Sequence, residues 1–215
     1  MKKTLVHWFG LFGVIGFASY VIGSLFAPSA YPGYNWMSQS VSDLYRVDAP
    51  SFALWNQIAI LYAIGGLVCV LMLSIAVQGK WNKSLRFGIY LLAGATWTSS
   101  ISATILRFST AENAIVVPSL ISIIINQAVI WLIAISMILM MVGGYRKKRF
   151  VSIAVSATAA LVLLLIGMTC LIFVPVEYSG IINRIITLSV IGFTALLGLF
   201  LFMGKLDDTG NNHTG

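Results

Sequence analysis

Six long apolar runs dominate this sequence, and each is long enough to cross a lipid bilayer as a helix. They cover approximately residues 5–27, 52–77, 87–106, 119–142, 151–174 and 183–204. A transmembrane helix needs about 20 mostly apolar residues. Because the connections leave no room for a separate soluble domain, the sequence predicts one all-α, polytopic membrane domain over residues 1–204. It is a six-transmembrane-helix bundle followed by a cytoplasmic tail at 205–215.

Composition excludes the main alternatives to this architecture. The chain is 59% hydrophobic and only 9% charged, whereas soluble domains are about 25% charged. A disordered chain is excluded for the same reason, and a β-barrel is excluded because its short segments alternate in polarity. The first run has Lys2 and Lys3 before it, but it is longer than a signal-peptide core of about 7–15 residues, so we expect a retained anchor.

Lysine and arginine fall on alternate connections. Ten of them lie at the N-terminus, in the second and fourth connections and in the tail, and with the two acidic residues of the tail that side carries a net charge of +8. The other side has three arginines and four acidic residues, a net charge of −1. The positive-inside rule therefore places both termini in the cytoplasm of a bacterial cell. The basic segments predict contact with membrane lipids and no nucleic-acid partner, since no recognition motif accompanies them.

Cysteine and histidine are too few for a metal centre. Cys69 and Cys170 both lie inside apolar runs, and His7 and His213 stand at opposite ends of the chain. This pattern predicts no disulfide framework and no metal site. We likewise expect no cofactor and assign no catalytic residue.

Polar side chains concentrate in the outer halves of the predicted spans. Asn56 and Gln57 open the second run, the polar segment 96–104 ends the third, and Asn126 and Gln127 lie early in the fourth. Hydroxyl groups alone are typical of helix packing, but an amide has four hydrogen-bonding sites to satisfy. Because polar groups are costly in hydrocarbon, we expect a hydrated or ligand-filled cavity that opens outward.

The first outer segment, between Pro28 and Pro50, has an amphipathic pattern. Met37, Val41 and Leu44 recur at helical spacing. The sequence therefore predicts a short interfacial helix over Asn35–Arg46, in which Asp43 and Arg46 are spaced to pair. Such a helix is either a lid over the cavity or a simple membrane anchor, and both interpretations remain open.

Charged residues near the outer ends of the spans complete the candidate site. We expect the acids Asp43, Glu112 and Glu177 to pair with the bases Arg46, Arg107 and Arg184, since all six share one depth. The candidate ligand-binding residues are Ser42, Asp43, Arg46, Asn56, Gln57, Ser99, Arg107, Asn126 and Arg184.

Two short motifs resemble a known family. They are the Tyr-x-Gly-Tyr-Asn-Trp-x-Ser-x-Ser-Val-Ser-Asp-Leu run of Tyr31–Leu44, followed by Trp55-Asn56, and the Gly180-x-x-x-Arg184 entry to the last span. This pattern resembles bacterial membrane proteins known as domain of unknown function 998. The resemblance implies a bundle of about six spans and supplies no reaction. Family members often carry a histidine near the start of the fourth span, where this chain has Asn126-Gln127.

Three classes of function fit these features. We expect a non-catalytic membrane protein that binds a lipid headgroup or a small amphiphilic ligand in the outward-facing cavity. One alternative is an intramembrane hydrolase or transferase acting on a lipid. Ser42 with Asp43 would serve it but lacks a nearby histidine base, and Glu112 with Glu177 would serve it as paired carboxylates but lies next to arginines. The other alternative is a small transporter or accessory subunit. For transport, Gly65-Gly66 is the mid-span candidate for a break, although it is more typical of close packing.

Overall fold

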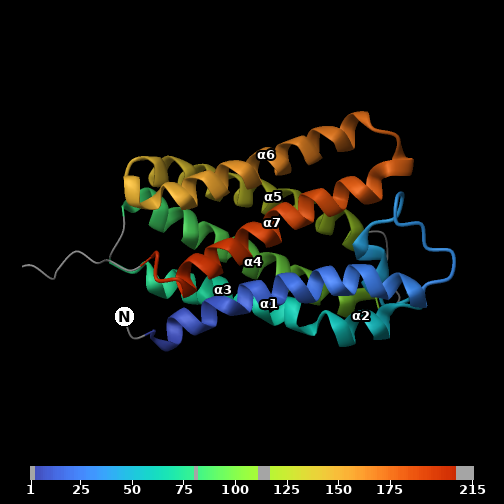
Figure 1. Ribbon diagram of the computed structural model, residues 1–215. Helices are drawn as coiled ribbons and strands as arrows, with labels where there is room; N and C mark the ends of the chain where they lie inside the picture. The colour runs from blue at the N-terminus through green and yellow to red at the C-terminus, as the bar shows by residue number, and fades with distance from the viewer. Residues whose placement is uncertain (1–2, 80–81, 111–116, 207–215) are drawn as a thin grey trace, which may run out of the picture.

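The computed structural model describes residues 3–79, 82–110 and 117–206, with 104–110 and 117–123 described by their backbone only. This part of the chain is a bundle of long α-helices (Figure 1). The α-helices are α1 (Leu5–Phe26), α2 (Phe52–Ile58), α3 (Ile60–Ala76), α4 (Lys83–Thr110), α5 (Val117–Tyr145), α6 (Val151–Phe173) and α7 (Ser179–Phe202). Short 3-10 turns are η1 (Ala27–Ala30), η2 (Val41–Tyr45), η3 (Lys148–Phe150) and η4 (Val176–Tyr178).

Each predicted run is helical, and the structure supports a multi-pass membrane architecture. In the described residues, four helical segments are long and apolar enough to cross a membrane, and they contain α1, α6, α7 and the Ile124–Tyr145 part of α5. The bent pair α2 and α3 adds a fifth if it forms one span. The described part of α4 is not among them, because Ser and Thr occupy much of its second half.

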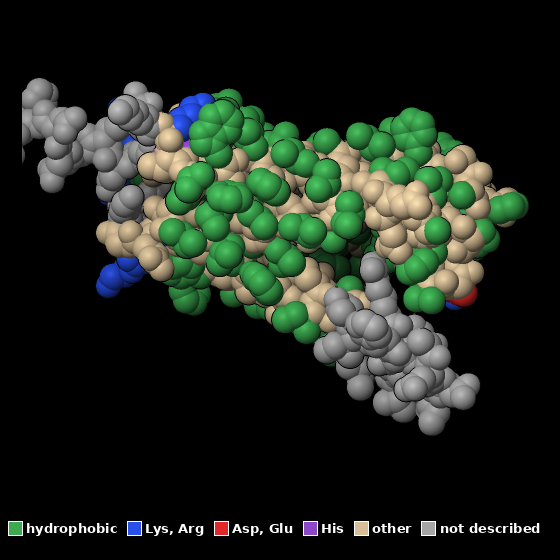
Figure 2. All heavy atoms as spheres, turned by 90° about the horizontal axis from the view of Figure 1, so that it is seen from below, with side chains coloured by type: hydrophobic (Ala, Val, Ile, Leu, Met, Phe, Trp, Pro, Cys, Tyr) green, Lys and Arg blue, Asp and Glu red, His purple; other side chains and the backbone are tan. Residues whose placement is uncertain are grey.

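The helices form a closed ring. Along the chain, α3 packs on α4, α4 on α5, α5 on α6 and α6 on α7, and α7 packs back on α3, while α1 packs against both α3 and α7. The start of α1 and the end of α7 lie at one end of the bundle, and the first loop (residues 27–51) lies at the other, which we call the loop end (Figure 1). Figure 2 shows lysine and arginine side chains gathered at the end away from the loop and hydrophobic side chains along the flank.

Helix α1 packs closely because a stripe of small residues faces its neighbours. A Cβ atom on Gly10 would lie 2.5 Å from the Gly198 carbonyl oxygen of α7, and one on Gly65 of α3 would overlap the Phe12 carbonyl. Gly66 faces open space, so only the first glycine of that pair is a packing site. Small residues let helix backbones approach within a membrane. The buried residues of α1 are His7, Gly10, Gly13, Gly16, Ser19, Tyr20 and Gly23.

The predicted second span is not one straight helix. It breaks at Ala59, where α2 and α3 meet at an angle of 44°. The break frees the Ile58 carbonyl oxygen, which accepts a hydrogen bond of 2.7 Å from the Ser19 hydroxyl of α1. A side chain of a neighbouring helix therefore satisfies the backbone group, as a kink in a membrane requires.

The interfacial helix predicted over Asn35–Arg46 is wrong in extent. Only η2 (Val41–Tyr45) is helical, and the preceding residues form turns. Of the predicted apolar stripe, Val41 and Leu44 are buried, whereas Met37 is 38% exposed. The stripe therefore packs this loop onto the bundle rather than onto a membrane surface.

Candidate functional site

A polar pocket of about 100 Å³ lies where the first loop meets α1, α3 and α7. Most of its lining side chains carry a hydroxyl or an amide. They are Tyr20 of α1, Tyr62 of α3, Asn183 and Thr187 of α7, and Ser40, Val41, Ser42 and Tyr45 of the loop. Binding sites for drug-sized molecules are about 300–1,000 Å³, so this pocket accommodates several waters or one small polar group.

Aromatic rings that pack on one another form one wall of this pocket. The Tyr20 ring meets the Trp55 ring edge-on, with centroids 5.8 Å apart, and lies 5.0 Å from the Tyr62 ring. The Tyr45 ring also packs on Trp55, with centroids 5.4 Å apart. Trp55 is only 3% exposed. The break at Ala59 lies between the two parts of this wall, because Trp55 belongs to α2 and Tyr62 lies in the first turn of α3.

The loop residues of the pocket are held by a capping box. The Ser40 amide and hydroxyl donate to one carboxylate oxygen of Asp43, at 2.8 Å and 3.0 Å. The Asp43 amide donates to the Ser40 carbonyl at 3.2 Å. These reciprocal bonds fix the start of η2. The Ser42 hydroxyl contacts that of Ser40 and lines the pocket.

The predicted ion pair between Asp43 and Arg46 is wrong. Arg46 binds Asp48 through two hydrogen bonds of 3.1 Å and 2.9 Å, on the exposed surface of the loop. These bonds lower the pKa of the Asp48 carboxyl. Asp43 instead serves the cap, because an extended residue at Ser40 presents two donors to its carboxylate.

Arg184 of α7 fastens the first loop to the bundle. Its Nη1 donates to the carbonyl oxygens of Trp36 at 2.6 Å, Gln39 at 3.0 Å and Gly180 at 3.0 Å. Its Nη2 donates to the Tyr34 hydroxyl at 2.7 Å. The planar guanidinium has five donors and binds loop carbonyls. If the loop were an α-helix, its own backbone amides would bind these carbonyls instead.

The first turn of α7 completes this attachment. A Cβ atom on Gly180 would lie 2.8 Å from the Met37 carbonyl oxygen and would overlap that of Gln39. The Ser179 hydroxyl donates to the Ser38 carbonyl at 2.9 Å. Only glycine leaves room for the loop at this distance. Gly180 therefore lets the loop approach α7, and Arg184, one turn later, binds the same loop.

Tyr34 links the loop to itself and to Arg184. Its hydroxyl donates to the Ser40 carbonyl at 2.9 Å while it accepts from the guanidinium. Burial raises the pKa of the Tyr34 phenol, and the charge of Arg184 opposes that effect. The phenol therefore stays protonated at neutral pH and keeps its donor.

A family model described as a protein of unknown function, DUF998, matches residues 14–200. The chain belongs to this family. No curated protein and no solved structure matches the chain. The matched region of the DUF998 protein contains the polar pocket, Arg184 and the whole first loop, and the resemblance seen in the sequence is confirmed.

The structure brings three predicted site residues of the DUF998 protein to the first loop. Ser42 lines the pocket, Asp43 caps η2, and Arg184 fastens the loop. Arg46 lies on the exposed side of the same loop. Arg184 is therefore a positioning residue here, with its guanidinium directed at backbone oxygens.

The other candidates lie elsewhere. Asn56 is half-buried and Gln57 is exposed on α2, while Ser99 of α4 and Asn126 of α5 are exposed, and none of these four lines the pocket. The side chain of Arg107 lies outside the described residues.

The predicted layer of paired charges is wrong for the described residues of the loop end, where Glu177 is exposed and forms no ion pair. Within the described residues of the loop end, Arg46 pairs with Asp48, and Arg184 binds carbonyl oxygens instead of a carboxylate. Glu112 lies outside the described residues, as does the side chain of Arg107.

Sequence reasoning missed Tyr20 and Tyr62 as site residues. Tyr20 had a usable signal, because it follows the glycine stripe of α1 by four residues and so belongs to the buried face. Tyr62 had none, since its position depends on the break at Ala59.

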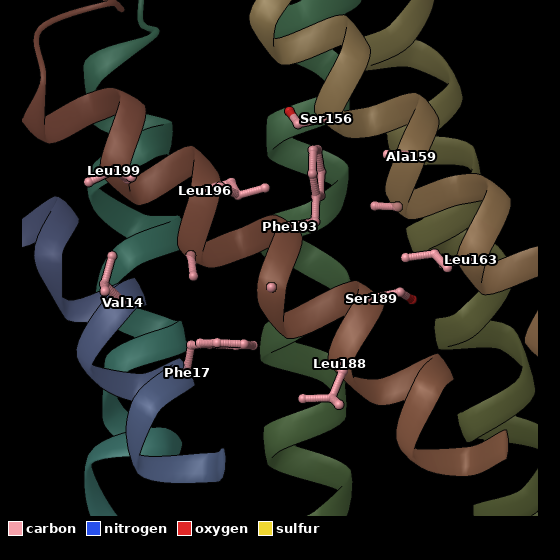
Figure 3. Close-up of a pocket in the computed structure, with 13 residues that line it drawn as sticks. Val14, Phe17, Ser156, Ala159, Leu163, Leu188, Ser189, Phe193, Leu196 and Leu199 are labelled. Carbon is pink, nitrogen blue, oxygen red and sulfur yellow. The ribbon is translucent and has the colours of Figure 1, made fainter. Parts of the chain in front are cut away.

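A larger apolar groove of about 410 Å³ runs between α1 and α6 over α7 (Figure 3). Its lining includes Phe17, Leu163, Gly192 and Leu196. The hydroxyls of its two serines donate to carbonyls of their own helices. Gly192 lies about 140° around α7 from Thr187, so the groove and the polar pocket open on different sides of this helix.

Proposed function

We propose that this DUF998 protein is a six-span protein of the bacterial plasma membrane, with both termini cytoplasmic. We further propose that it binds a lipid headgroup or a small amphiphile, without catalysis, at the polar pocket beneath its first loop. The ligand's apolar part would remain in the surrounding lipid.

The proposed topology is supported by charge and by the arrangement of the helices. The basic connections carry a net +8 against −1 on the other side, and the start of α1 and the end of α7 share one end of the bundle. Six spans with α4 as the third account for both observations. A Lys147→Cys variant should resist an impermeant thiol reagent added outside intact cells, and its labelling there would overturn the topology.

The observation that carries the binding proposal is the character of the pocket. Hydroxyl and amide groups of α1, α3, α7 and the loop converge on about 100 Å³ at the loop end of an otherwise apolar bundle. Polar clusters within membrane segments are costly and usually functional. The fastened loop fixes Ser40 and Ser42 over α7, so the pocket is formed before any ligand arrives.

The direct test is native mass spectrometry of protein purified in mild detergent. We expect the wild type to retain a lipid or small amphiphile, and Asn183→Leu and Ser42→Leu to retain at least tenfold less. Thr169→Ala is the matched control, because its exposed hydroxyl on α6 donates only within its own helix. A wild type without bound ligand, or equal retention in all variants, would contradict the proposal.

One arrangement favours hydrolysis as a second candidate. Ser42 contacts Ser40, which in turn hydrogen-bonds Asp43. A serine nucleophile needs a general base, but this carboxylate already accepts both cap bonds, and His7 lies near the start of α1, at the other end of the bundle. Labelling of Ser42 by a fluorophosphonate, abolished in Ser42→Ala, would favour catalysis over binding.

A further inference from the structure

The directions of the hydrogen bonds around the polar pocket decide what its side chains offer to a ligand. On the loop side, the Ser40 hydroxyl donates to the Asp43 carboxylate at 3.0 Å. A serine hydroxyl has a single hydrogen, so the hydrogen bond between Ser40 and Ser42 uses the hydrogen of Ser42. The Ser42 oxygen, which lines the pocket, is therefore an acceptor. Because this chain of hydroxyls ends at a carboxylate, it also makes the Ser42 oxygen more negative.

The helix side of the pocket is also rich in acceptors. The Thr187 hydroxyl donates to the Asn183 carbonyl of its own helix at 2.8 Å, so it can only accept from the Tyr20 phenol, its partner across the pocket. The phenol oxygen therefore has its hydrogen committed to the protein. The Asn183 side chain donates from Nδ2 to the Ser179 carbonyl at 2.9 Å. Its Oδ1 accepts no hydrogen bond from the residues that the structure describes.

The charges around the pocket favour a cation over a phosphate. None of the described side chains that line it carries a formal charge. The negative charge of Asp43 reaches it through the two serines, whereas Arg184 does not line it and directs its guanidinium at loop carbonyls. Three tyrosine rings belong to the lining, and the faces of aromatic rings attract cations. A phosphate would instead require charged or backbone donors.

We propose that the pocket binds a primary ammonium group, carried by an aminophospholipid or by a small amphiphilic amine. This inference rests on the proposed binding function and specifies its ligand class. An ammonium has three N–H donors and no acceptor, which matches the oxygens of Ser42, Asn183 and Tyr20. A trimethylammonium has the same charge but lacks the N–H groups that these oxygens would accept. The volume of about 100 Å³ accommodates an ammonium with its first methylene groups.

The ligand class is tested in vesicles that contain equal amounts of phosphatidylethanolamine, phosphatidylcholine and phosphatidylglycerol with identical acyl chains. Native mass spectrometry then measures which lipid the wild type retains. We expect phosphatidylethanolamine to be retained at least tenfold over each of the others. Equal retention of phosphatidylethanolamine and phosphatidylcholine, or a preference for phosphatidylglycerol, would overturn the ammonium assignment and leave the binding function standing.

A second arm distinguishes the two sources of the ammonium. Dodecylammonium and dodecyltrimethylammonium are added at equal concentration to protein in phosphatidylcholine vesicles. Selective retention of dodecylammonium without retention of phosphatidylethanolamine would assign the same site to a small amphiphilic amine. Equal retention of the two detergents would overturn the ammonium assignment. Absence of any bound molecule in both arms would instead contradict the proposed binding function.

Thr187→Val tests the hydrogen-bond directions. The variant keeps the shape of the side chain but removes the acceptor of Tyr20, so the phenol hydrogen is free to point at the ammonium and oppose it. We expect the ratio of phosphatidylethanolamine to phosphatidylcholine retained to fall at least fivefold. Thr169→Val is the matched control, because it removes a 2.8 Å bond to a carbonyl four residues earlier on the exposed side of α6. An unchanged ratio in Thr187→Val, or an equal fall in Thr169→Val, would overturn the assignment.

Discussion

The loop ends of α1 and α7 differ from the neighbouring parts of α4 and α5 in how their polar groups are satisfied. Around α7, the guanidinium of Arg184 and the hydroxyls of Ser179 and Tyr34 all bond to backbone carbonyls of the first loop. On α4 and α5, Ser99, Asn126 and Gln127 are exposed. The comparison teaches that similar polar residues at similar depth serve internal structure in one region and face outward in the other.

The largest effect should come from Arg184→Ala. It removes charged hydrogen bonds to two loop carbonyls and to Tyr34, each worth about 1.5–3 kcal/mol at most. Because water can replace part of them, we expect a net loss of about 2–3 kcal/mol in the free energy of unfolding, measured by denaturant titration in micelles. Arg46→Ala is the control and should change nothing measurable, since its pair is on the surface. An equal loss of unfolding free energy in Arg184→Ala and Arg46→Ala would show that Arg184 does not hold the loop more firmly than a surface ion pair does.

Gly180→Val should have the next largest effect. The added side chain would displace the Met37 and Gln39 carbonyls, and such overpacking costs about 1–3 kcal/mol. Gly66→Val is the matched control, because Gly66 faces open space on α3. Thermal unfolding followed by a thiol-reactive dye compares the two. If both glycines tolerate valine equally, the loop does not pack on α7 as described.

The sequence predicted the helices of this comparison better than the loop that joins them. All six apolar runs are helical, because long uninterrupted runs leave few other structures in a membrane. The helix over Asn35–Arg46 was wrong because Arg184 binds the carbonyls of Trp36 and Gln39, which lie 148 and 145 residues before it in the sequence. Similarly, the Ile58 carbonyl that the break at Ala59 frees is satisfied by Ser19 of another helix. Local patterns do not record such distant partners.

The candidate site was predicted in part for the same reason. Ser42 faces the pocket and Arg184 lies beside it, as their position near the outer ends indicated. Asn56 and Asn126 share that depth but do not line the pocket, because depth alone does not specify which face of a helix is turned inward. Of the tyrosines that line the pocket, Tyr45 was missed because tyrosine is also common at membrane interfaces. Tyr62 was missed because its position depends on the break at Ala59.

Tyr34→Phe should have a smaller effect than either α7 variant. It removes the hydroxyl between Arg184 and the Ser40 carbonyl, at a cost of about 1 kcal/mol. Burial raises the pKa of this phenol in the folded protein, so its contribution is complete below the unfolded value of about 10 and is lost as the pH rises above it. Unfolding titrations at pH 8 and pH 11 should therefore show a smaller difference between Tyr34→Phe and the wild type at pH 11. A constant difference would contradict this role.

The smallest effect should come from Ser99→Ala and Asn126→Ala. Both side chains are exposed and contribute little to the folded monomer, so each change should stay within about 0.5 kcal/mol. The same denaturant titration measures it. A loss comparable to that of Arg184→Ala would show that α4 and α5 satisfy their polar groups internally as well.

Hydrogen–deuterium exchange of residues 34–45 tests the attachment of the first loop most directly. In this account the Gln39, Ser40 and Asp43 amides are hydrogen-bonded and held by Arg184. We predict that this segment exchanges at least tenfold more slowly than an unstructured peptide, that Arg184→Ala abolishes the protection, and that Arg46→Ala preserves it. Exchange of the wild-type segment at the unstructured rate, or unchanged protection in Arg184→Ala, would contradict the account.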